Sequence, residues 1–190
     1  MSQPQQQEVL TVRAFLQSVQ EERGNKNQDI PICYEYLKIV NDKDSGSEQQ
    51  LLVLKDLHLR YVDFSNLNVP KEFCAKAVAY RCNFRESNWS NAQGELRIYG
   101  SDVSDANFTG AEGFLFCDAY NLDFLPAKGL TAEQAKSIIP VSIETRSLLG
   151  TCNTEHFNYI IEQEKRLLGL DATVAALAEQ VAQLTRQRQQ

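Results

Sequence analysis

The chain has 190 residues, of which 43% are hydrophobic, and its 19 basic and 25 acidic residues give a formal net charge of −6. This composition excludes a disordered chain, because enough apolar surface is present for a core, and the acidic balance disfavours nucleic-acid binding through phosphate contacts. The 5 cysteines form an odd set without a CxxC pair, which favours a reducing compartment over a disulfide framework.

The N-terminal residues 1–7 are polar and rich in glutamine, without the apolar region of a cleaved signal peptide. No apolar run reaches the roughly 18 residues that a membrane span needs. We therefore expect a soluble protein with no membrane span, located in the cytoplasm or secreted into a host cell without a cleaved signal.

Residues 1–50 are predicted to form an N-terminal capping segment. Apolar side chains recur at helical spacing between Glu8 and Glu22, and Gly24, Asn25 and Asn27 end this predicted helix. Residues 30–40 fit either a strand or a short helix, and residues 42–50 are predicted as a polar loop. A cap is expected because the open end of a β stack otherwise recruits another chain.

Residues 51–130 carry a repeat with a period of five. The column from Leu54 to Gly94 is apolar at eight of its nine positions, and the column two residues earlier is mostly small or aliphatic. This period is neither the 2 of a strand nor the 3.6 of a helix, so it indicates stacked units that bury their apolar faces against one another. A column of short polar side chains predicts a corner in each unit, because Asp and Asn bond their own backbone in turns. Its first members are Asp63, Asn68, Asn83 and Asn88.

The register of the repeat changes twice. One residue is missing after Gly94 and one is gained around Phe114–Phe116, which predicts a local bulge with the stack continuing beyond it. Residues 70–76 break the pattern and are predicted as a loop or a bulged corner. After the second change, the expected inward positions are Ala119, Phe124 and Gly129, preceded by Cys117, Leu122 and Ala127.

The pattern resembles the pentapeptide-repeat family, whose consensus unit is Ala-Asp/Asn-Leu/Phe-x-x. Residues 106–110 and 82–86 match the consensus best, and residues 127–134 resemble a common ending of such domains. The resemblance covers residues 52–130 and implies a right-handed four-sided β-helix of about four coils. The predicted fold class is therefore mainly β, with an N-terminal cap and an α-helical C-terminal extension.

Residues 131–190 are predicted to form that extension. Thr131 and Gln134 have the spacing of a capping box at the start of a short helix that ends before Pro140. A heptad helix is predicted over residues 155–188, with Val at position a and Leu at position d, a choice that favours parallel two-stranded coils. Its predicted dimer seam consists of Ile160, Leu167, Leu170, Val174, Leu177, Val181 and Leu184. Two arrangements stay open, a homodimer through this helix or a helix folded back on its own repeat domain.

The sequence contains no constellation that indicates catalysis, a cofactor or a metal. His58 and His156 have no cysteine or acidic partner at ligand spacing, and there is no GxSxG, phosphate loop, HExxH or EF-hand pattern. Asp102 and Asp105 are expected on a solvated corner rather than as paired catalytic carboxylates. We therefore predict that the protein is not an enzyme and holds no cofactor.

Aromatic residues outside the inward columns lie beside arginines, a composition typical of protein-binding surfaces. The predicted surface consists of Tyr61, Tyr80, Arg81, Arg97, Tyr99, Phe114 and Phe116. The alternative is that these side chains pack against the terminal segments.

These observations predict a non-enzymatic scaffold that binds a protein partner of unknown identity. The family resemblance implies a bacterial effector that acts on a host protein, or a DNA mimic that binds and protects the topoisomerase gyrase. Mimicry needs a long and strongly negative surface, whereas residues 51–130 carry 10 acidic and 8 basic residues, a net charge of −2.

Overall fold

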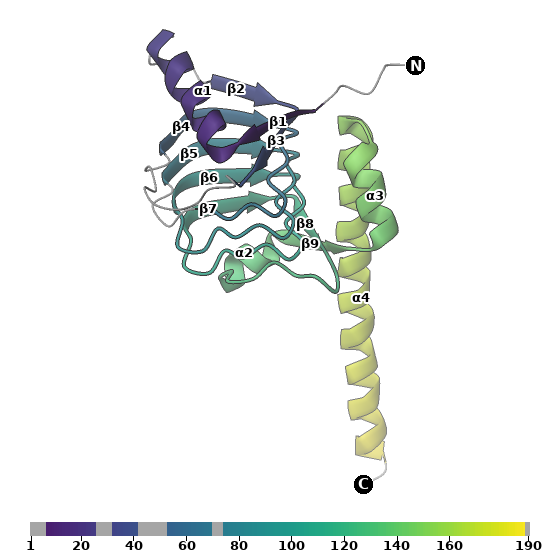
Figure 1. Ribbon diagram of the computed structural model, residues 1–190. Helices are drawn as coiled ribbons and strands as arrows, with labels where there is room; N and C mark the ends of the chain where they lie inside the picture. Colours follow the sequence, from purple (N-terminus) through teal and green to yellow (C-terminus); the bar gives the residue numbers. More distant parts are fainter. Residues whose placement is uncertain (1–6, 26–31, 42–52, 70–73, 189–190) are drawn as a thin grey trace. The chain divides into compact units, whose positions relative to one another are not determined.

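The computed structural model describes residues 7–25, 32–41, 53–69 and 74–188 and divides into two units (Figure 1). The first, Met1–Ser142, contains every described strand and is called the sheet unit. The second, Ile143–Gln190, contains two helices and is called the helical unit.

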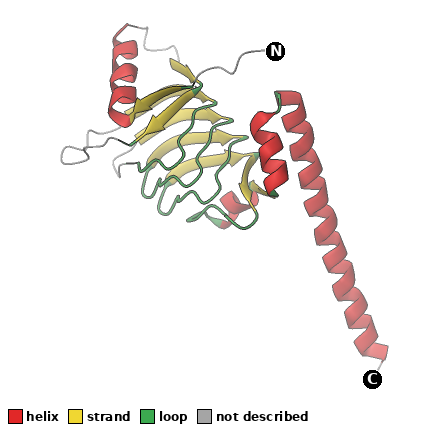
Figure 2. Ribbon diagram, turned by 45° about the vertical axis from the view of Figure 1, so that its right-hand side comes forward, coloured by secondary structure: helices red, strands yellow, loops and turns green. Residues whose placement is uncertain are grey.

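A five-stranded parallel sheet, in the order β2-β4-β5-β6-β7, forms the centre of the sheet unit (Figure 2). Its strands are β2 (Ile32–Glu35), β4 (Val53–Arg60), β5 (Cys74–Tyr80), β6 (Gln93–Tyr99) and β7 (Glu112–Cys117). Two short parallel pairs accompany it, β1 (Glu8–Thr11) with β3 (Leu37–Val40) and β8 (Ala119–Leu122) with β9 (Ile138–Val141). Because every pairing is parallel, the carboxyl ends of the five central strands lie along one edge.

Short polar side chains shape the turn segments between the strands. The Asp63 Oδ1 accepts the backbone N–H of Ser65 at 2.9 Å, and the Asn83 Oδ1 accepts that of Arg85 at 3.1 Å. Successive turns are also joined, because the Asn83 Nδ2 donates to the Asp63 Oδ1 at 3.0 Å. The predicted corner role of these two residues is therefore confirmed.

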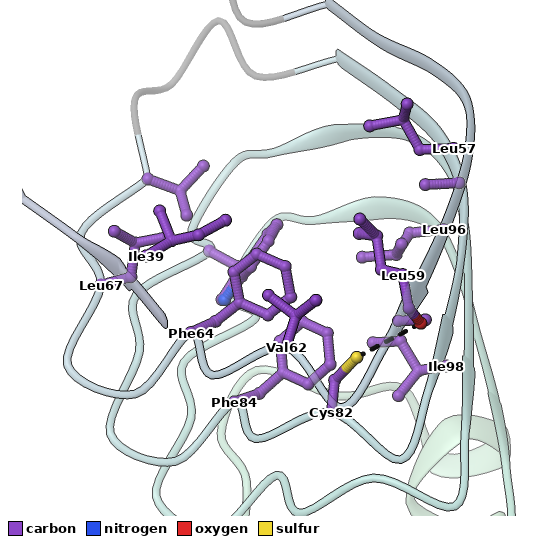
Figure 3. Close-up of a cluster of buried hydrophobic side chains, with 14 of the residues drawn as sticks. Ile39, Leu57, Leu59, Val62, Phe64, Leu67, Cys82, Phe84, Leu96 and Ile98 are labelled. Atoms are coloured by element: carbon purple, nitrogen blue, oxygen red, sulfur yellow. Dashed lines mark hydrogen bonds between the residues drawn. The ribbon is translucent and has the colours of Figure 1, made fainter. Parts of the chain in front are cut away.

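The two apolar columns of the repeat form the core (Figure 3). The Phe64 and Phe84 rings stack with centroids 5.1 Å apart, and the buried Trp89 indole lies edge-on to Phe64 and donates to the Ser87 Oγ at 2.8 Å. The predicted burial of both columns is confirmed at the described positions Leu57, Leu59, Val62, Phe64, Leu67, Val69, Ala77, Ala79, Cys82, Phe84, Trp89 and Ala92.

The predicted fold class, a mainly β pentapeptide-repeat β-helix, is wrong. The structure is a mixed α/β fold, 39% helical and 32% strand, with a central parallel sheet flanked by helices. Strands β4, β5 and β6 hold 8, 7 and 7 residues, longer than the five-residue sides that the prediction assumed. The apolar period specifies which side chains are buried, and it does not specify where the chain turns.

The two register changes have different outcomes. The first is confirmed, because the pairing of β6 with β7 is irregular between Gln93 and Leu96. After the second, Ala119 and Leu122 are buried as expected, but Cys117 and Phe124 are exposed where inward positions were expected, and Phe114 and Phe116 are buried instead. The register of β7 was therefore predicted wrongly.

The N-terminal helix is confirmed with a later start. Residues 8–11 form β1, and α1 (Val12–Asn25) follows, with the Thr11 Oγ1 accepting the backbone N–H of Ala14 at 3.2 Å. Residues 32–40 form β2 and β3, so the strand alternative is confirmed with a break at Tyr36, and the short helix is wrong. The predicted loop at residues 42–50 and most of the predicted break at residues 70–76 lie outside the described residues.

The predicted capping box is confirmed at α2 (Ala132–Lys136). The Thr131 Oγ1 accepts the backbone N–H of Gln134, whose side chain accepts that of Thr131. The Gln134 Nε2 also donates to the Phe114 carbonyl in β7 at 3.0 Å, which joins α2 to the last strand of the central sheet.

The helical unit consists of α3 (Ile143–Thr151) and α4 (Thr154–Arg188), so the long predicted helix is confirmed. The Asn153 Oδ1 accepts the backbone N–H of His156 at 2.9 Å at the start of α4. The Thr145 Oγ1 donates to the Glu164 Oε1 at 2.8 Å and joins the two helices. Among the described residues, no helix has the length and apolar content that a membrane crossing requires.

Candidate interaction surfaces

The carboxyl ends of the central strands place aromatic and basic residues in two adjacent columns. The last residues of β2, β4, β5 and β6 pair in parallel register, and they are Glu35, Arg60, Tyr80 and Tyr99. The next residue along the chain forms the second column, which consists of Tyr36, Tyr61, Arg81 and Gly100, and each of these donates its backbone N–H to the strand that follows in the sheet. We call Tyr36, Arg60, Tyr61, Tyr80, Arg81 and Tyr99 the tyrosine–arginine face.

Ring contacts hold the side chains of this face. The Tyr36 and Tyr61 rings are stacked, with centroids 5.0 Å apart and planes 10° from parallel, and Tyr80 meets Tyr61 edge-on at 6.5 Å. The Arg60 guanidinium lies 5.5 Å from the centre of the Tyr80 ring, and the Arg81 guanidinium lies 5.6 Å from that of Tyr61. Such cation–π contacts at exposed sites contribute about 0.5–1 kcal/mol each and restrict the side chains.

The charges of the face are also arranged by the register. The Arg60 Nη1 lies 3.3 Å from the Glu35 Oε1, an exposed ion pair between neighbouring strands. Arg97 is exposed on β6 two residues before Tyr99, so its side chain points to the same side of the sheet as that tyrosine. Arginine therefore outnumbers glutamate here, although the chain as a whole is acidic.

The backbone of the second column is left-handed, as it is at other corners of the fold such as Asn66 and Asp105. Tyr36, Tyr61 and Arg81 have φ of 58°, 54° and 51°, in the left-handed region that costs a residue with a side chain roughly 1–2 kcal/mol. Gly100 occupies the same column with φ 53°, so glycine fits this corner. The sequence keeps large side chains at three corners where the fold would accept glycine.

The structure brings together five of the seven predicted surface residues, Tyr61, Tyr80, Arg81, Arg97 and Tyr99. Phe114 and Phe116 do not join them, because their side chains are buried against Phe108. Tyr36 belongs to the face and was not predicted, since the structure of residues 30–40 was undecided from the sequence. Its position directly after an alternating strand is the signal that identifies it.

The sequence-predicted histidines and the possible metal ligands can be placed in the structure. No group of three or more His, Cys, Asp or Glu side chains is placed to hold a metal among them. His58 is exposed on β4 opposite Cys33 of β2, and His156 is exposed near the start of α4. Burial raises the pKa of the Cys82 thiol to about 12, which keeps it protonated and unreactive at neutral pH.

The predicted dimer seam lies along α4. From Leu167 to Leu184 each of its six residues is 54–64% exposed, and Ile160 is partly buried. The side chains of Phe157 and Ile161, near the start of the helix, are buried. The exposed part of the seam is therefore the part that lies beyond the first turns of α4.

No protein-family model matches the chain, and no curated protein is similar enough to it to match. The resemblance to the pentapeptide-repeat family is therefore wrong, in agreement with the mixed α/β fold.

Proposed function

We propose that the chain is a non-enzymatic scaffold whose tyrosine–arginine face binds another protein. The observation that supports this most is the left-handed backbone of Tyr36, Tyr61 and Arg81. The fold repeats this left-handed backbone at other corners, where Asn, Asp, Glu or Gly stand, so what it does not require is a tyrosine or arginine at such a corner. Residues held in strained conformations are typical of functional sites, where the strain is retained for the sake of the side chain. Tyrosine and arginine are also the residues most often found at the energetic centres of protein interfaces.

The charge of the face indicates the kind of segment it binds. The Arg60 and Arg81 guanidinium groups lie over the rings, and Glu35 is paired with Arg60. Arg97 and Glu95 are exposed on β6, on the same side of the sheet as Tyr99. A partner segment that carries carboxylates complements this surface, since arginine donates two parallel hydrogen bonds to a carboxylate. The net charge of −6 disfavours nucleic acid as the partner.

The test compares proteins captured from a lysate by the wild type, by Tyr61→Gly and by Phe124→Ala. Tyr61→Gly removes the central ring of the face from a corner that accepts glycine, and Phe124→Ala removes an exposed ring from another part of the sheet unit. We expect proteins that bind the wild type and Phe124→Ala but not Tyr61→Gly. Equal capture by all three chains would contradict a binding role for the face.

We also propose that two copies of the chain associate through the seam of α4. Six exposed apolar side chains in a heptad pattern support this, because such a stripe is normally buried in a coiled coil. Light scattering tests it with Leu177→Asp, which places a charge in the seam, and Ala176→Asp, which places the same charge beside it. We expect a dimer for the wild type and for Ala176→Asp and a monomer for Leu177→Asp; a monomeric wild type would exclude the dimer.

A reducing compartment, the cytoplasm of the producing cell or of a host cell, suits the cysteines. Cys33, Cys82, Cys117 and Cys152 are free thiols, and two of them are exposed. The gyrase-binding and effector hypotheses depended on the family resemblance, and no contact in the structure favours either of them.

A further inference from the structure

The apolar stripe of α4 continues well beyond the part of the helix that is joined to α3. The hydrogen bond from Thr145 reaches Glu164, and the exposed seam begins at Leu167. From Leu167 to Leu184 the stripe is about 26 Å long, because an α-helix rises 1.5 Å per residue. This length offers three pairs of a and d positions to a partner helix.

We infer that a second copy of the chain covers this stripe with its α4 parallel and in register. The inference rests on the dimer proposed above and adds the orientation of its two helices. It also assigns a specific role to two charged residues beside the seam, Arg166 and Asp171.

The apolar layers are compatible with parallel pairing. In that arrangement Val174 and Val181 meet their own copies at position a, and Leu170, Leu177 and Leu184 meet theirs at position d. Val at a with Leu at d is the combination that favours two parallel strands.

The apolar layers alone, however, do not choose the orientation. An antiparallel pair would place Leu167 opposite Leu184, Leu170 opposite Val181 and Val174 opposite Leu177. Every layer would still pair an a residue with a d residue and bury six apolar side chains from each copy. The choice between the orientations must therefore come from residues beside the seam.

The flanking charges favour the parallel arrangement. Arg166 occupies position g and Asp171 position e of the next heptad, and both side chains are exposed. In a parallel coil, position g of one helix faces position e of the next heptad of the other, so Arg166 lies opposite Asp171 of the second copy. Two-fold symmetry repeats this ion pair.

The antiparallel arrangement loses both ion pairs. Positions e then face e and positions g face g, which places Asp171 opposite Ala178 and Arg166 opposite Gln187. The later flanking pairs of the parallel coil, Thr173 with Ala178 and Gln180 with Thr185, are neutral and oppose neither orientation. The ion pair between Arg166 and Asp171 of the second copy, which occurs twice in the symmetric dimer, therefore favours the parallel orientation.

Disulfide formation between engineered cysteines in the full-length chain tests the orientation. Leu184→Cys should form a disulfide with its own copy, because position 184 of one chain meets position 184 of the other only when the helices are parallel. A mixture of Leu167→Cys and Leu184→Cys chains tests the opposite case, since these positions meet only in the antiparallel pair. The wild type, oxidised in the same way, shows the cross-linking that its native cysteines produce. We expect Leu184→Cys dimers above that level and no mixed dimers.

A charge exchange tests the role of the two flanking residues. Arg166→Asp should weaken the dimer roughly tenfold in sedimentation at low salt, because two attractive pairs become repulsive. Combining it with Asp171→Arg should restore the affinity, and Arg186→Asp, which makes the same change away from the seam, should have little effect.

The outcomes separate this inference from the proposed function. A wild type that is monomeric at all concentrations would show that the proposed dimer itself is wrong. A dimer that forms mixed Leu167→Cys and Leu184→Cys disulfides, or that Arg166→Asp leaves unchanged, would retain the dimer and overturn the parallel orientation.

Discussion

Phe84 is completely buried in the sheet unit, in contact with two other aromatic rings. Its centroid lies 5.1 Å from that of Phe64 and 5.3 Å from that of Trp89. We expect Phe84→Ala to lower the free energy of unfolding by about 3–5 kcal/mol, because it removes a large side chain and leaves a cavity. Chemical denaturation measures this loss. Arg85→Ala is the control, since its exposed ion pair with Glu86 contributes less than about 1 kcal/mol.

Two substitutions of Tyr61 distinguish the energy of its backbone conformation from the energy of its side-chain contacts. At φ 54° alanine keeps the strain of the left-handed region, whereas glycine relieves it, and both substitutions remove the ring contacts. We therefore expect Tyr61→Gly to be more stable than Tyr61→Ala by about 1 kcal/mol, measured by thermal or chemical unfolding. Equal stabilities would mean that the corner is not strained, and the main support for the proposed function would be lost.

The buried thiol of Cys82 makes the free energy of unfolding depend on pH in the alkaline range. Its thiol pKa is raised from 9.0 to about 12, chiefly because burial disfavours the thiolate. A raised folded-state pKa gives stability that is complete below the unfolded value of 9.0 and is lost as the pH rises towards 12. Between about pH 8.5 and 10.5 the wild type should lose more unfolding free energy than Cys82→Ala. Chemical denaturation at the two pH values measures this difference. Equal losses of unfolding free energy in the wild type and in Cys82→Ala would contradict the prediction.

At the scale of elements, Gly113 controls the pairing of β6 with β7. Its φ is 76°, and a Cβ on it would lie 1.9 Å from the Gly94 carbonyl oxygen, a distance that no substitution can accept without moving a strand. Gly113→Ala should therefore lower the free energy of unfolding by more than about 2 kcal/mol, as measured by chemical denaturation. Gly150→Ala meets no atom within 4 Å in α3 and should be neutral or stabilising.

Strand β7 and its neighbours show which features the sequence predicts and which it does not. The five-residue columns identified buried side chains such as Leu57 and Phe84, because burial follows directly from apolar periodicity. They did not identify the α/β fold, the burial of Phe114, or the close approach of the preceding Gly113 to Gly94. Contacts between residues distant in sequence carry no local pattern.

The candidate face was predictable in part for a similar reason. Tyr61, Tyr80 and Tyr99 were found because they lie outside the apolar columns at regular spacing. Their stacking and the left-handed corner of Tyr36 depend on the parallel register of four strands, which only the structure supplies. The capping box of α2 and the extent of α4 were predictable because both depend on residues close together in the chain.

At the scale of the whole molecule, the chain divides into two units, and the main core belongs to one of them. The main hydrophobic cluster runs from Phe15 to Ile138 and lies entirely within the sheet unit. A chain that ends at Ser142 should therefore unfold cooperatively and remain monomeric, because it retains this cluster and lacks α4. Thermal unfolding and light scattering test both points. A truncated chain that dimerises would place the dimer contact in the sheet unit, and one that fails to fold would contradict the independence of the units.

The bond from Gln134 to the Phe114 carbonyl covers part of one edge of the central sheet. Strand β7 lies at the end of the central sheet, and an uncovered terminal strand is a template onto which further chains can polymerise. Because Gln134 closes the capping box of α2 and also occupies an acceptor of β7, its side chain covers one backbone group of this template. The same side chain that caps a helix thereby makes pairing of a further chain with β7 less favourable.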